Sequence, residues 1–438
     1  MPRPFKFLVL ATLLLRTGHA LAVCPDLTPY YPGTNPDWSA VRLQLAGLMP
    51  ECLESSEYFA LYGAAQLNSG DVAESMESLE RALLLDPLNG AAQIDYAQAL
   101  YLQGDLFAAL ELNDRLLARD DLPANLRSLI QNWQQSWRAE TRQRLVQLDV
   151  MAGYDNNLNS APTPDEITLT LSGEDVVLAL NPDFQPLSGP YLNLRLGARF
   201  RQLAPDYQHN LLLEVRGRVS EDSQSDQLQL DTRYAFVLPG RRQSWQLDAG
   251  MSHLFFGGTP LYTATETSAR YLPSSSGRCQ PYYGLALQHQ LFHDNSRLNG
   301  LEAKASGGMN CPFNADNGQR QLTLEVALLE NVALKNNRAG DDRSGWQTSL
   351  RWRTPLGIGD FTSQLSHTRL DDRAGYNPLL SGGAERWLER SYVLLQYRRP
   401  VSAQAIMLFN VFHQTQHSNI DLFDTTDTTI EVGFSLRL

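Results

Sequence analysis

The chain has 438 residues, a formal net charge of −12 and a mildly polar mean hydropathy of −0.31. An acidic chain of this kind argues against a nucleic-acid-binding protein, because nucleic acids attract basic surfaces. The four cysteines and eight histidines do not cluster at metal-ligand spacing, so we expect no zinc or iron site and no cofactor.

Residues 1–22 have the pattern of a secretory signal peptide. Arg3 and Lys6 precede the apolar run 7–15, and the small-residue cleavage sequence Ala20-Leu21-Ala22 follows. The run is too short to span a bilayer as a helix, and no later apolar run approaches 18 residues. The sequence ending at Cys24 approximates a lipoprotein signal, which remains an alternative, but we prefer cleavage after Ala22. The mature chain is therefore predicted to be exported.

Residues 23–140 are predicted to form a helical domain. The stretches 57–89 and 91–120 resemble two tetratricopeptide repeats, and a helix near 123–139 caps them. Positions that the repeat reserves for packing residues and for a terminating proline are occupied by Phe59, Gly63, Ala82, Pro87, Tyr96 and Ala97. Such a stack is either a generic set of helical hairpins or a concave surface for a protein partner, and we favour the partner surface.

From Arg142 onward, apolar and polar residues alternate with the period of a β-strand. The last ten residues, TIEVGFSLRL, place five apolar side chains on one face and polar ones on the other. Segments of about 9–12 alternating residues suit a strand that crosses a bilayer at a tilt, and they exceed the usual strand length of soluble domains. An exported chain without spanning helices can cross lipid only as a closed barrel. Residues 141–438 are therefore predicted to be an outer-membrane β-barrel, which makes the whole chain an α+β multidomain protein.

The alternating segments predict 14 strands, although 12 or 16 remain possible. Short turns and long polar connections alternate between them, as expected for periplasmic turns and outer loops. The longest connection, about 155–188, contains two further strand-like runs, ITLTL and VVLAL. The predicted strands are 143–154, 189–202, 210–220, 226–238, 243–256, 260–271, 280–292, 298–308, 320–333, 344–354, 359–370, 389–399, 403–414 and 427–437.

The end of the first predicted strand carries the sequence Gly-Tyr-Asp-Asn-Asn-Leu-Asn. Asp and Asn are common in turns, which explains the residue types but not the length of the loop that follows. A signal peptide, tetratricopeptide repeats and a barrel with this element after its first strand resemble the surface lipoprotein assembly modulator family. The positions that match the family's element are Gly153, Tyr154, Asp155, Asn157 and Asn159.

The resemblance implies a 14-strand barrel in the outer membrane of a Gram-negative bacterium, with the helical domain in the periplasm. It also implies a translocator that delivers a lipoprotein or a small secreted protein to the cell surface. The partners would be outer-membrane lipid, the client protein and a periplasmic chaperone.

Two other functions compete with this interpretation. Several outer-membrane barrels are enzymes, and seven histidines follow the signal peptide, some near strand ends. No serine nucleophile motif accompanies them, so we predict ordinary surface histidines and no catalytic residues. The second competitor is an exopolysaccharide export porin with a basic lumen. Its candidate lumen arginines are Arg195, Arg199, Arg201, Arg216, Arg218, Arg233, Arg351 and Arg353, although pairing with Glu214, Asp231 and Asp248 would cancel such a field.

The four cysteines predict two disulfides. Cys279 and Cys311 lie symmetrically about Asn295 in one predicted hairpin, so folding the hairpin brings both thiols to its periplasmic end. Cys24 and Cys52 would then pair within the N-terminal region, in an oxidising compartment.

Overall fold

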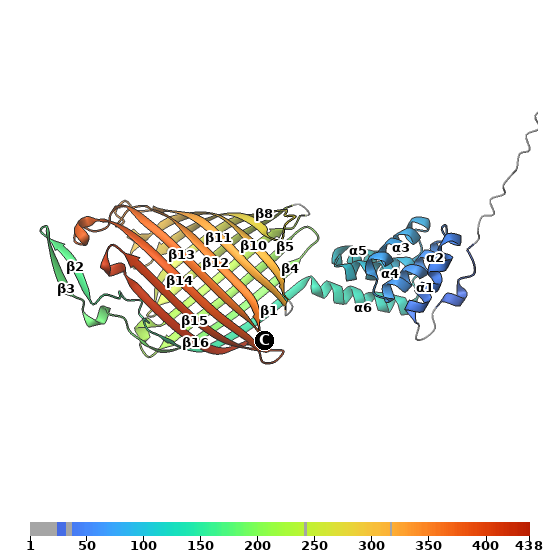
Figure 1. The fold of residues 1–438 in the computed structure, drawn as a ribbon, viewed down its shortest axis with the longest axis horizontal. Coiled ribbons are helices and arrows are strands. Elements are labelled where there is room, and N and C mark those ends of the chain that lie inside the picture. The colour runs from blue at the N-terminus through green and yellow to red at the C-terminus, as the bar shows by residue number, and fades with distance from the viewer. Residues whose placement is uncertain (1–23, 32–36, 241–242, 316–317) are drawn as a thin grey trace, which may run out of the picture. The chain divides into compact units, whose positions relative to one another are not determined.

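A computed structural model describes residues 24–31, 37–240, 243–315 and 318–438. The predicted signal peptide and its cleavage site lie outside the described residues. The chain divides into two compact units, Met1–Glu140 and Thr141–Leu438. The first is helical and the second is a β-barrel (Figure 1). Within the described residues, no helix has both the length and the apolar character needed to cross a membrane.

The helical unit is built from antiparallel helix pairs. Side-chain caps fix several helix starts: Ser55 accepts from the Tyr58 amide at 3.1 Å, and Asn89 accepts from the Ala92 amide at 3.0 Å. Gly104 ends one helix with a φ of +95°, which favours glycine. The α-helices in the described residues are α1 Trp38–Leu48, α2 Ser56–Asn68, α3 Val72–Leu85, α4 Gly90–Gln103, α5 Leu106–Leu117 and α6 Ala124–Glu140.

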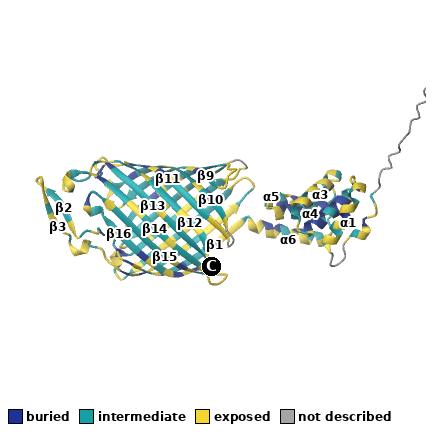
Figure 2. Cartoon of the chain, in the orientation of Figure 1, coloured by how far each residue is buried: buried dark blue, intermediate teal, exposed yellow. Residues whose placement is uncertain are grey.

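The core of this unit lies between the helices, where the pattern predicted packing residues. Phe59, Ala82 and Ala97 are buried. Gly63 lets α2 approach α3 closely, because a Cβ there would lie 2.6 Å from the Leu79 side chain. Figure 2 shows this buried centre under an exposed surface.

Two residues of the predicted packing set are not fully buried. Pro87 is exposed in the turn between α3 and α4, directly after Asp86, which ends α3. Tyr96 is half-buried and packs against the core, and its hydroxyl donates to Glu80 Oε1 at 2.7 Å.

In the described part of the second unit, 14 antiparallel strands close into a barrel in which β1 pairs with β16 on one side and β4 on the other. The strands are β1 Arg142–Asp155, β4 Gly189–Leu203, β5 Gln208–Ser220, β6 Gln227–Leu238, β7 Gln243–Phe256, β8 Thr259–Pro273, β9 Gln280–Phe292, β10 Gly300–Ala315, β11 Gly318–Ala333, β12 Arg343–Leu356, β13 Gly359–Gly375, β14 Glu385–Pro400, β15 Ala405–Ser418 and β16 Thr425–Arg437. Each contains or overlaps one predicted strand, so the fold class and the strand number are confirmed.

The barrel has the reverse polarity of a water-soluble core. On β16, Ile430 and Phe434 lie on the outer wall and are 51% and 50% exposed. Gly433 and Ser435, which flank Phe434 in the chain, are buried. The same alternation runs along β4 and β5, with leucine and valine outside and arginine inside. An apolar outer wall around a polar interior is the pattern of a barrel that spans lipid.

The two ends of the barrel differ in their connections. At the end where β1 begins and β16 finishes, here called the terminal end, the connections are short, such as 357–358 and 401–404. At the opposite end, here called the loop end, they include 334–342, 376–384 and the longest, 156–188. The two strand-like runs predicted inside that longest loop form a hairpin of β2 Glu166–Leu171 and β3 Glu174–Ala179, which extends beyond the loop end in Figure 1.

Candidate functional site in the barrel lumen

The Gly153–Asn159 element lies at the loop end, where β1 meets β16. Asp155 and Asn157 are each 1% exposed, and Tyr154 is 53% exposed on the outer wall. Asp155 accepts from the Asn157 amide at 2.7 Å and forms an ion pair of 2.8 Å with Arg218 on β5. Arg218 also donates to the Leu158 and Ser225 carbonyls. The carboxylate therefore joins the end of β1 to β5 and to the neighbouring loop.

The two asparagines of the element fasten the longest loop at its base. Asn157 exchanges hydrogen bonds with Ala161, both 2.9 Å, and donates to the Thr426 carbonyl on β16 at 3.1 Å. Asn159 donates to the Gln185 carbonyl at 2.9 Å and accepts from the Leu187 amide at 3.0 Å. These bonds hold the start of the loop against its end and against β16.

Gly153 has a different role, because it permits a side chain to cross β1. A Cβ at position 153 would lie 2.5 Å from the Tyr191 ring. Through this gap Tyr191 on β4 reaches across β1 and donates to Glu431 Oε1 on β16 at 2.8 Å. Glu431 also accepts from Asn193 on β4 and Asn410 on β15, each at 3.0 Å. We call Gly153, Tyr191, Asn193, Asn410 and Glu431 the seam latch.

A polar cavity of about 750 Å³ lies in the lumen beside the seam latch. Strands β1, β4, β5, β14, β15 and β16 contribute most of its lining. Of the predicted lumen arginines, the cavity brings together Arg195, Arg199, Arg216 and Arg218. Arg233 and Arg351 do not line it, and they lie on β6 and β12.

Most of these arginines are paired with carboxylates. Arg195 lies 3.0 Å from Asp149, and Arg216 lies 2.7 Å from Glu214. Arg233 lies 3.3 Å from Glu266. The charge around the cavity is therefore mixed, and the single-sign field that would attract an anionic polymer is largely cancelled.

Three further predicted arginines have local partners. Arg351 donates to Gln364 Oε1 at 2.8 Å, and Arg353 pairs with Asp360 at 3.1 Å. Arg201 donates to Gln208 Oε1 at 2.8 Å.

The histidines are spread along the outer wall, where several bond to hydroxyl groups. His209 contacts the Tyr234 hydroxyl at 2.6 Å, and His367 contacts Ser391 at 3.0 Å. His253 and His293 share the Thr263 hydroxyl at 2.6 and 2.7 Å. In the described residues no group of three or more His, Cys, Asp or Glu side chains could hold a metal ion.

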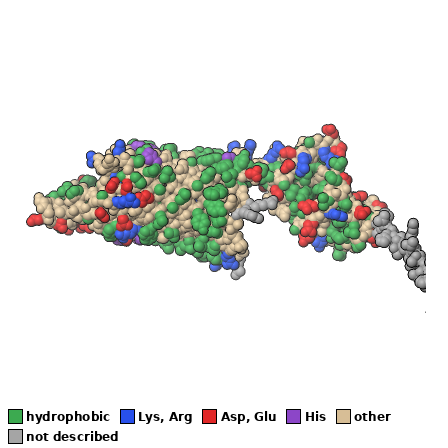
Figure 3. Space-filling view, turned by 90° about the horizontal axis from the view of Figure 1, so that it is seen from above, with side chains coloured by type: hydrophobic (Ala, Val, Ile, Leu, Met, Phe, Trp, Pro, Cys, Tyr) green, Lys and Arg blue, Asp and Glu red, His purple; other side chains and the backbone are tan. Residues whose placement is uncertain are grey.

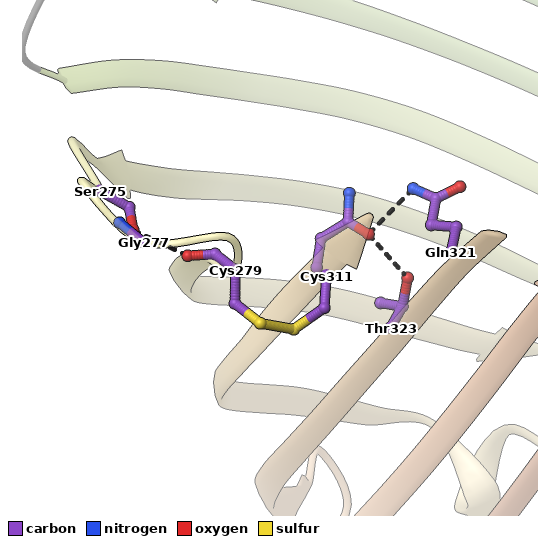
Figure 4. The surroundings of a disulfide bond; sticks show 7 residues. Ser275, Gly277, Cys279, Cys311, Gln321 and Thr323 are labelled. Carbon is purple, nitrogen blue, oxygen red and sulfur yellow. Dashed lines mark hydrogen bonds between the residues drawn. A yellow bond between two sulfur atoms is a disulfide. The ribbon is translucent and has the colours of Figure 1, made fainter. Parts of the chain in front are cut away.

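Both predicted disulfides are present. Cys24 is bonded to Cys52 in the helical unit, and Cys279 to Cys311 at the terminal end of β9 and β10. Figure 4 shows the second bond, with the Ser275 hydroxyl donating to the Cys279 carbonyl at 2.8 Å. The pairing of Gln280 with Asn310 places the two cysteines side by side.

An aromatic stack between α4 and α6 forms part of the core of the helical unit. The rings of Tyr101 and Trp137 stack with centroids 4.6 Å apart, and Trp133 stacks on Trp137 at 5.6 Å. On α4, burial raises the pKa of the Asp95 carboxyl to about 6.

Sequence reasoning missed four residues of the latch. They have ordinary residue types for a polar face, and only closure of the barrel brings them together: Tyr191, Asn193, Asn410 and Glu431. Asn156 was also outside the predicted set, although its side chain accepts from the Thr428 amide on β16 at 2.7 Å. The Asn-rich composition after β1 was the available signal for Asn156.

Comparison with known proteins adds a domain-level match. A tetratricopeptide repeat family model matches residues 66–132. No curated protein matches the chain at a significant level.

Solved structures with similar barrels include an anion-selective porin from Comamonas acidovorans, at 10% identity and a TM-score of 0.36, covering 68% of this chain and 99% of that chain. They also include a Pseudomonas aeruginosa FadL homologue, at 10% identity and a TM-score of 0.36, covering 67% and 89%. A third is a loop-deletion mutant of OmpT, an outer membrane protein of Vibrio cholerae, at 5% identity and a TM-score of 0.34, covering 68% and 100%. Similarities this weak give no information on the function of this chain.

Proposed function

We propose that this chain is exported by its signal peptide, spans the outer membrane of a Gram-negative bacterium and delivers a client protein to the cell surface. The client is a lipoprotein or a small secreted protein. The helical unit receives the client or its chaperone in the periplasm, and the barrel supplies the route. The chain contributes no catalysis of its own, so the driving force comes from folding of the client outside or from other machinery.

The observation that carries this proposal is the Gly153–Asn159 element in its structural setting. It follows a tetratricopeptide-like unit along the chain, as in the surface lipoprotein assembly modulators. Its side chains fasten both the β1–β16 seam and the base of the longest loop. Gly153 serves the latch directly, because only a residue without a side chain admits Tyr191. These features support a translocator of that kind.

The lumen supports a polypeptide in preference to an anionic polysaccharide. Its cavity combines arginine–carboxylate pairs with amide side chains and with apolar ones such as Leu394 and Phe412. A mixed lining makes weak contacts with many kinds of polypeptide segment. A polysaccharide exporter would benefit from unpaired basic side chains, and three of the arginines that line the cavity, Arg195, Arg216 and Arg218, are paired with carboxylates.

An in-frame deletion of residues 36–140 tests the proposal. Where the neighbouring genes encode a small exported protein, that protein is tested as the client, and its exposure is measured by protease treatment of intact cells. The barrel should still assemble, and the client should remain in the periplasm, protected from protease. Unchanged client exposure together with loss of a surface polysaccharide would contradict the proposal and favour the export porin.

A further inference from the structure

The outer wall of the barrel is hollowed along β10. Three successive outward residues of this strand are small: Ala303, Ala305 and Gly307. They alternate with lumen residues such as Lys304, which pairs with Glu325 at 2.9 Å. No other described strand of the barrel has alanine or glycine at three alternate positions in succession. This part of β10 therefore forms a low floor one strand wide.

Large apolar side chains stand on both sides of this floor. The pairing of the strands sets Ala305 between Leu285 on β9 and Leu328 on β11. These two leucines are 68% and 66% exposed, more than any other apolar residue in the described barrel strands. Tyr283 and Val326 flank the next small residue towards the terminal end and are 58% and 57% exposed. The four side chains are so exposed because the floor between them leaves their flanks uncovered.

Three adjoining hollows of about 660, 570 and 820 Å³ follow the floor, and we call them together the β10 groove. The first two share Leu285 and Leu328, and the last two share Tyr283 and Val326, so the groove is continuous. Two strand spacings, about 10 Å, separate β9 from β11. Side chains narrow this width further. The floor therefore admits a hydrocarbon chain but not a helix, whose diameter with side chains is about 10–12 Å.

The two ends of the β10 groove differ in charge. At the terminal end Arg320 on β11 lies opposite Phe313 on β10, and the Arg278 guanidinium lies over the Phe313 ring at 5.6 Å. Neither arginine has an ion-pair partner among the described residues. At the loop end the β11 side of the groove finishes at Glu330, which pairs with Arg373 at 2.6 Å. An anionic group is therefore attracted to the terminal end of the groove and not to its loop end.

The spacing between the arginines and the floor matches one leaflet of a bilayer. Cys279, which directly follows Arg278, is bonded to Cys311 and so ties that arginine to β10 near Phe313 (Figure 4). From Phe313 to Gly307 the strand climbs about 15 Å along the membrane normal, at about 3.3 Å per residue and a tilt near 40°. Half of a hydrocarbon core of about 30 Å is also about 15 Å. An acyl chain that starts at the arginines therefore reaches the floor near the bilayer centre.

We propose that the β10 groove binds one anionic phospholipid from the leaflet at the terminal end. Its phosphate lies between Arg278 and Arg320, because guanidinium groups bind phosphate through charge-assisted hydrogen bonds. One acyl chain runs along β10 to the small floor, where the flanking side chains contact it on both sides. On the face that Figure 3 draws, apolar side chains cover the part of the wall nearer the terminal end, as a wall in contact with hydrocarbon requires. The inference depends on the spanning barrel and not on the identity of any client.

Native mass spectrometry of the full-length protein in detergent, titrated with dioleoylphosphatidylglycerol, tests this inference. Ala305→Leu fills the floor of the groove, and a double variant with Arg278→Gln and Arg320→Gln removes the phosphate contacts. Ala198→Leu on β4 adds the same side chain to the outer wall away from the groove. Arg399→Gln removes an exposed arginine from the terminal end of β14. Heat-modifiable migration on unboiled gels establishes that each variant is folded.

The unchanged protein should retain one phosphatidylglycerol, and both groove variants should bind it at least about tenfold more weakly, because each loses contacts to the phosphate or to the acyl chain. The two control variants should bind as the unchanged protein does. Undiminished binding by either groove variant would overturn the inference. Equal losses in the groove and control variants would also overturn it, since the lipid would then cover the whole wall without a site. A dimer that Ala305→Leu dissociates would assign the groove to a second copy of the chain and reject phospholipid as its occupant.

Discussion

The helical unit and the barrel place their apolar side chains on opposite sides: inside in the helical unit, and on the outer wall in the barrel. In the helical unit Leu79 is fully buried and Leu84 on the same helix is 77% exposed, so the apolar face is inside. In the barrel Leu196 is 46% exposed, while Asp149 is 5% exposed in the lumen. The difference shows that each unit is matched to its surroundings: the first to water, the second to hydrocarbon outside and polar groups inside.

The largest expected difference between the units comes from placing the same charge on each. Leu196→Arg puts a cation near the middle of the outward run of β4 and should destabilise the barrel in lipid vesicles by up to about 4 kcal/mol. Leu84→Arg on the exposed face of α3 should change stability by less than about 0.5 kcal/mol. Urea titrations in vesicles measure both. Equal effects would mean that the outer wall of the barrel does not face lipid.

The two disulfides should act on separate units. Replacing Cys24 and Cys52 by serine should lower the unfolding free energy of the helical unit by about 3 kcal/mol and leave the barrel transition unchanged, because the bond closes a loop only within the first unit. The corresponding change at Cys279 and Cys311 should affect only the barrel. Separate calorimetric or denaturant transitions check this. Non-reducing peptide mapping that joined Cys24 to Cys279 would contradict both pairings.

The seam latch predicts a coupled effect at one glycine. Gly153→Ala should displace the Tyr191 ring and cost about 2 kcal/mol of barrel stability, as expected for overpacking. In a Tyr191→Ala background the same substitution should cost much less, because the ring that it meets is gone. Gly197→Ala, whose added Cβ would lie 4.0 Å from the Glu214 side chain and meet no clash, is the matched control. If the two substitutions cost additive amounts of stability in the double variant, the lack of a side chain at position 153 is not what accommodates the Tyr191 ring.

The smallest expected effect belongs to Asp95 in the helical unit. Its pKa of about 6 lies above the usual 3.8, so the folded state favours the protonated form. Stability should therefore fall as pH rises from about 4 to 6, and the penalty should be complete above that range. Asp95→Asn should stabilise the unit by about 1 kcal/mol at pH 8, after allowance for partial exposure, and by almost nothing at pH 4. An equal gain in stability at both pH values would mean that the gain does not come from the titration of Asp95.

Local patterns predicted most of the architecture because helix caps and strand alternation act over a few residues. The ends of strands were less predictable. The alternation on β10 becomes indistinct at Gly307 and Gly308, and the prediction stopped there, yet the strand continues through Pro312 to Ala315. The pairing of Cys311 with Leu322, and of Pro312 with Gln321, continues the ladder past the proline. Hydrogen bonding to β11 therefore keeps this segment in the sheet, although its own sequence no longer alternates.

The site was predictable only where its residues are neighbours in the chain. The Gly153–Asn159 element could be located from residue types, but the partners of Gly153 lie at positions 191 and 431 and meet it through barrel closure. The sequence alone could not decide whether the lumen arginines pair with carboxylates, because those pairs also join residues that are distant in the chain. Arg195 pairs with Asp149 because β1 and β4 align those two residues, and that register depends on the whole sheet.

Photocrosslinking of the client in transit tests the central claim most directly. Gln396 lines the lumen cavity, whereas its neighbour Leu395 faces outward. A benzophenone amino acid would be placed at either position in the full-length protein, in cells that also express the client identified by the surface-exposure assay. We predict an adduct of the two proteins at position 396, weak or absent labelling at position 395, and loss of the adduct when residues 36–140 are deleted. An adduct at position 395 alone, or none at 396 while the client still reaches the surface, would contradict passage through the lumen.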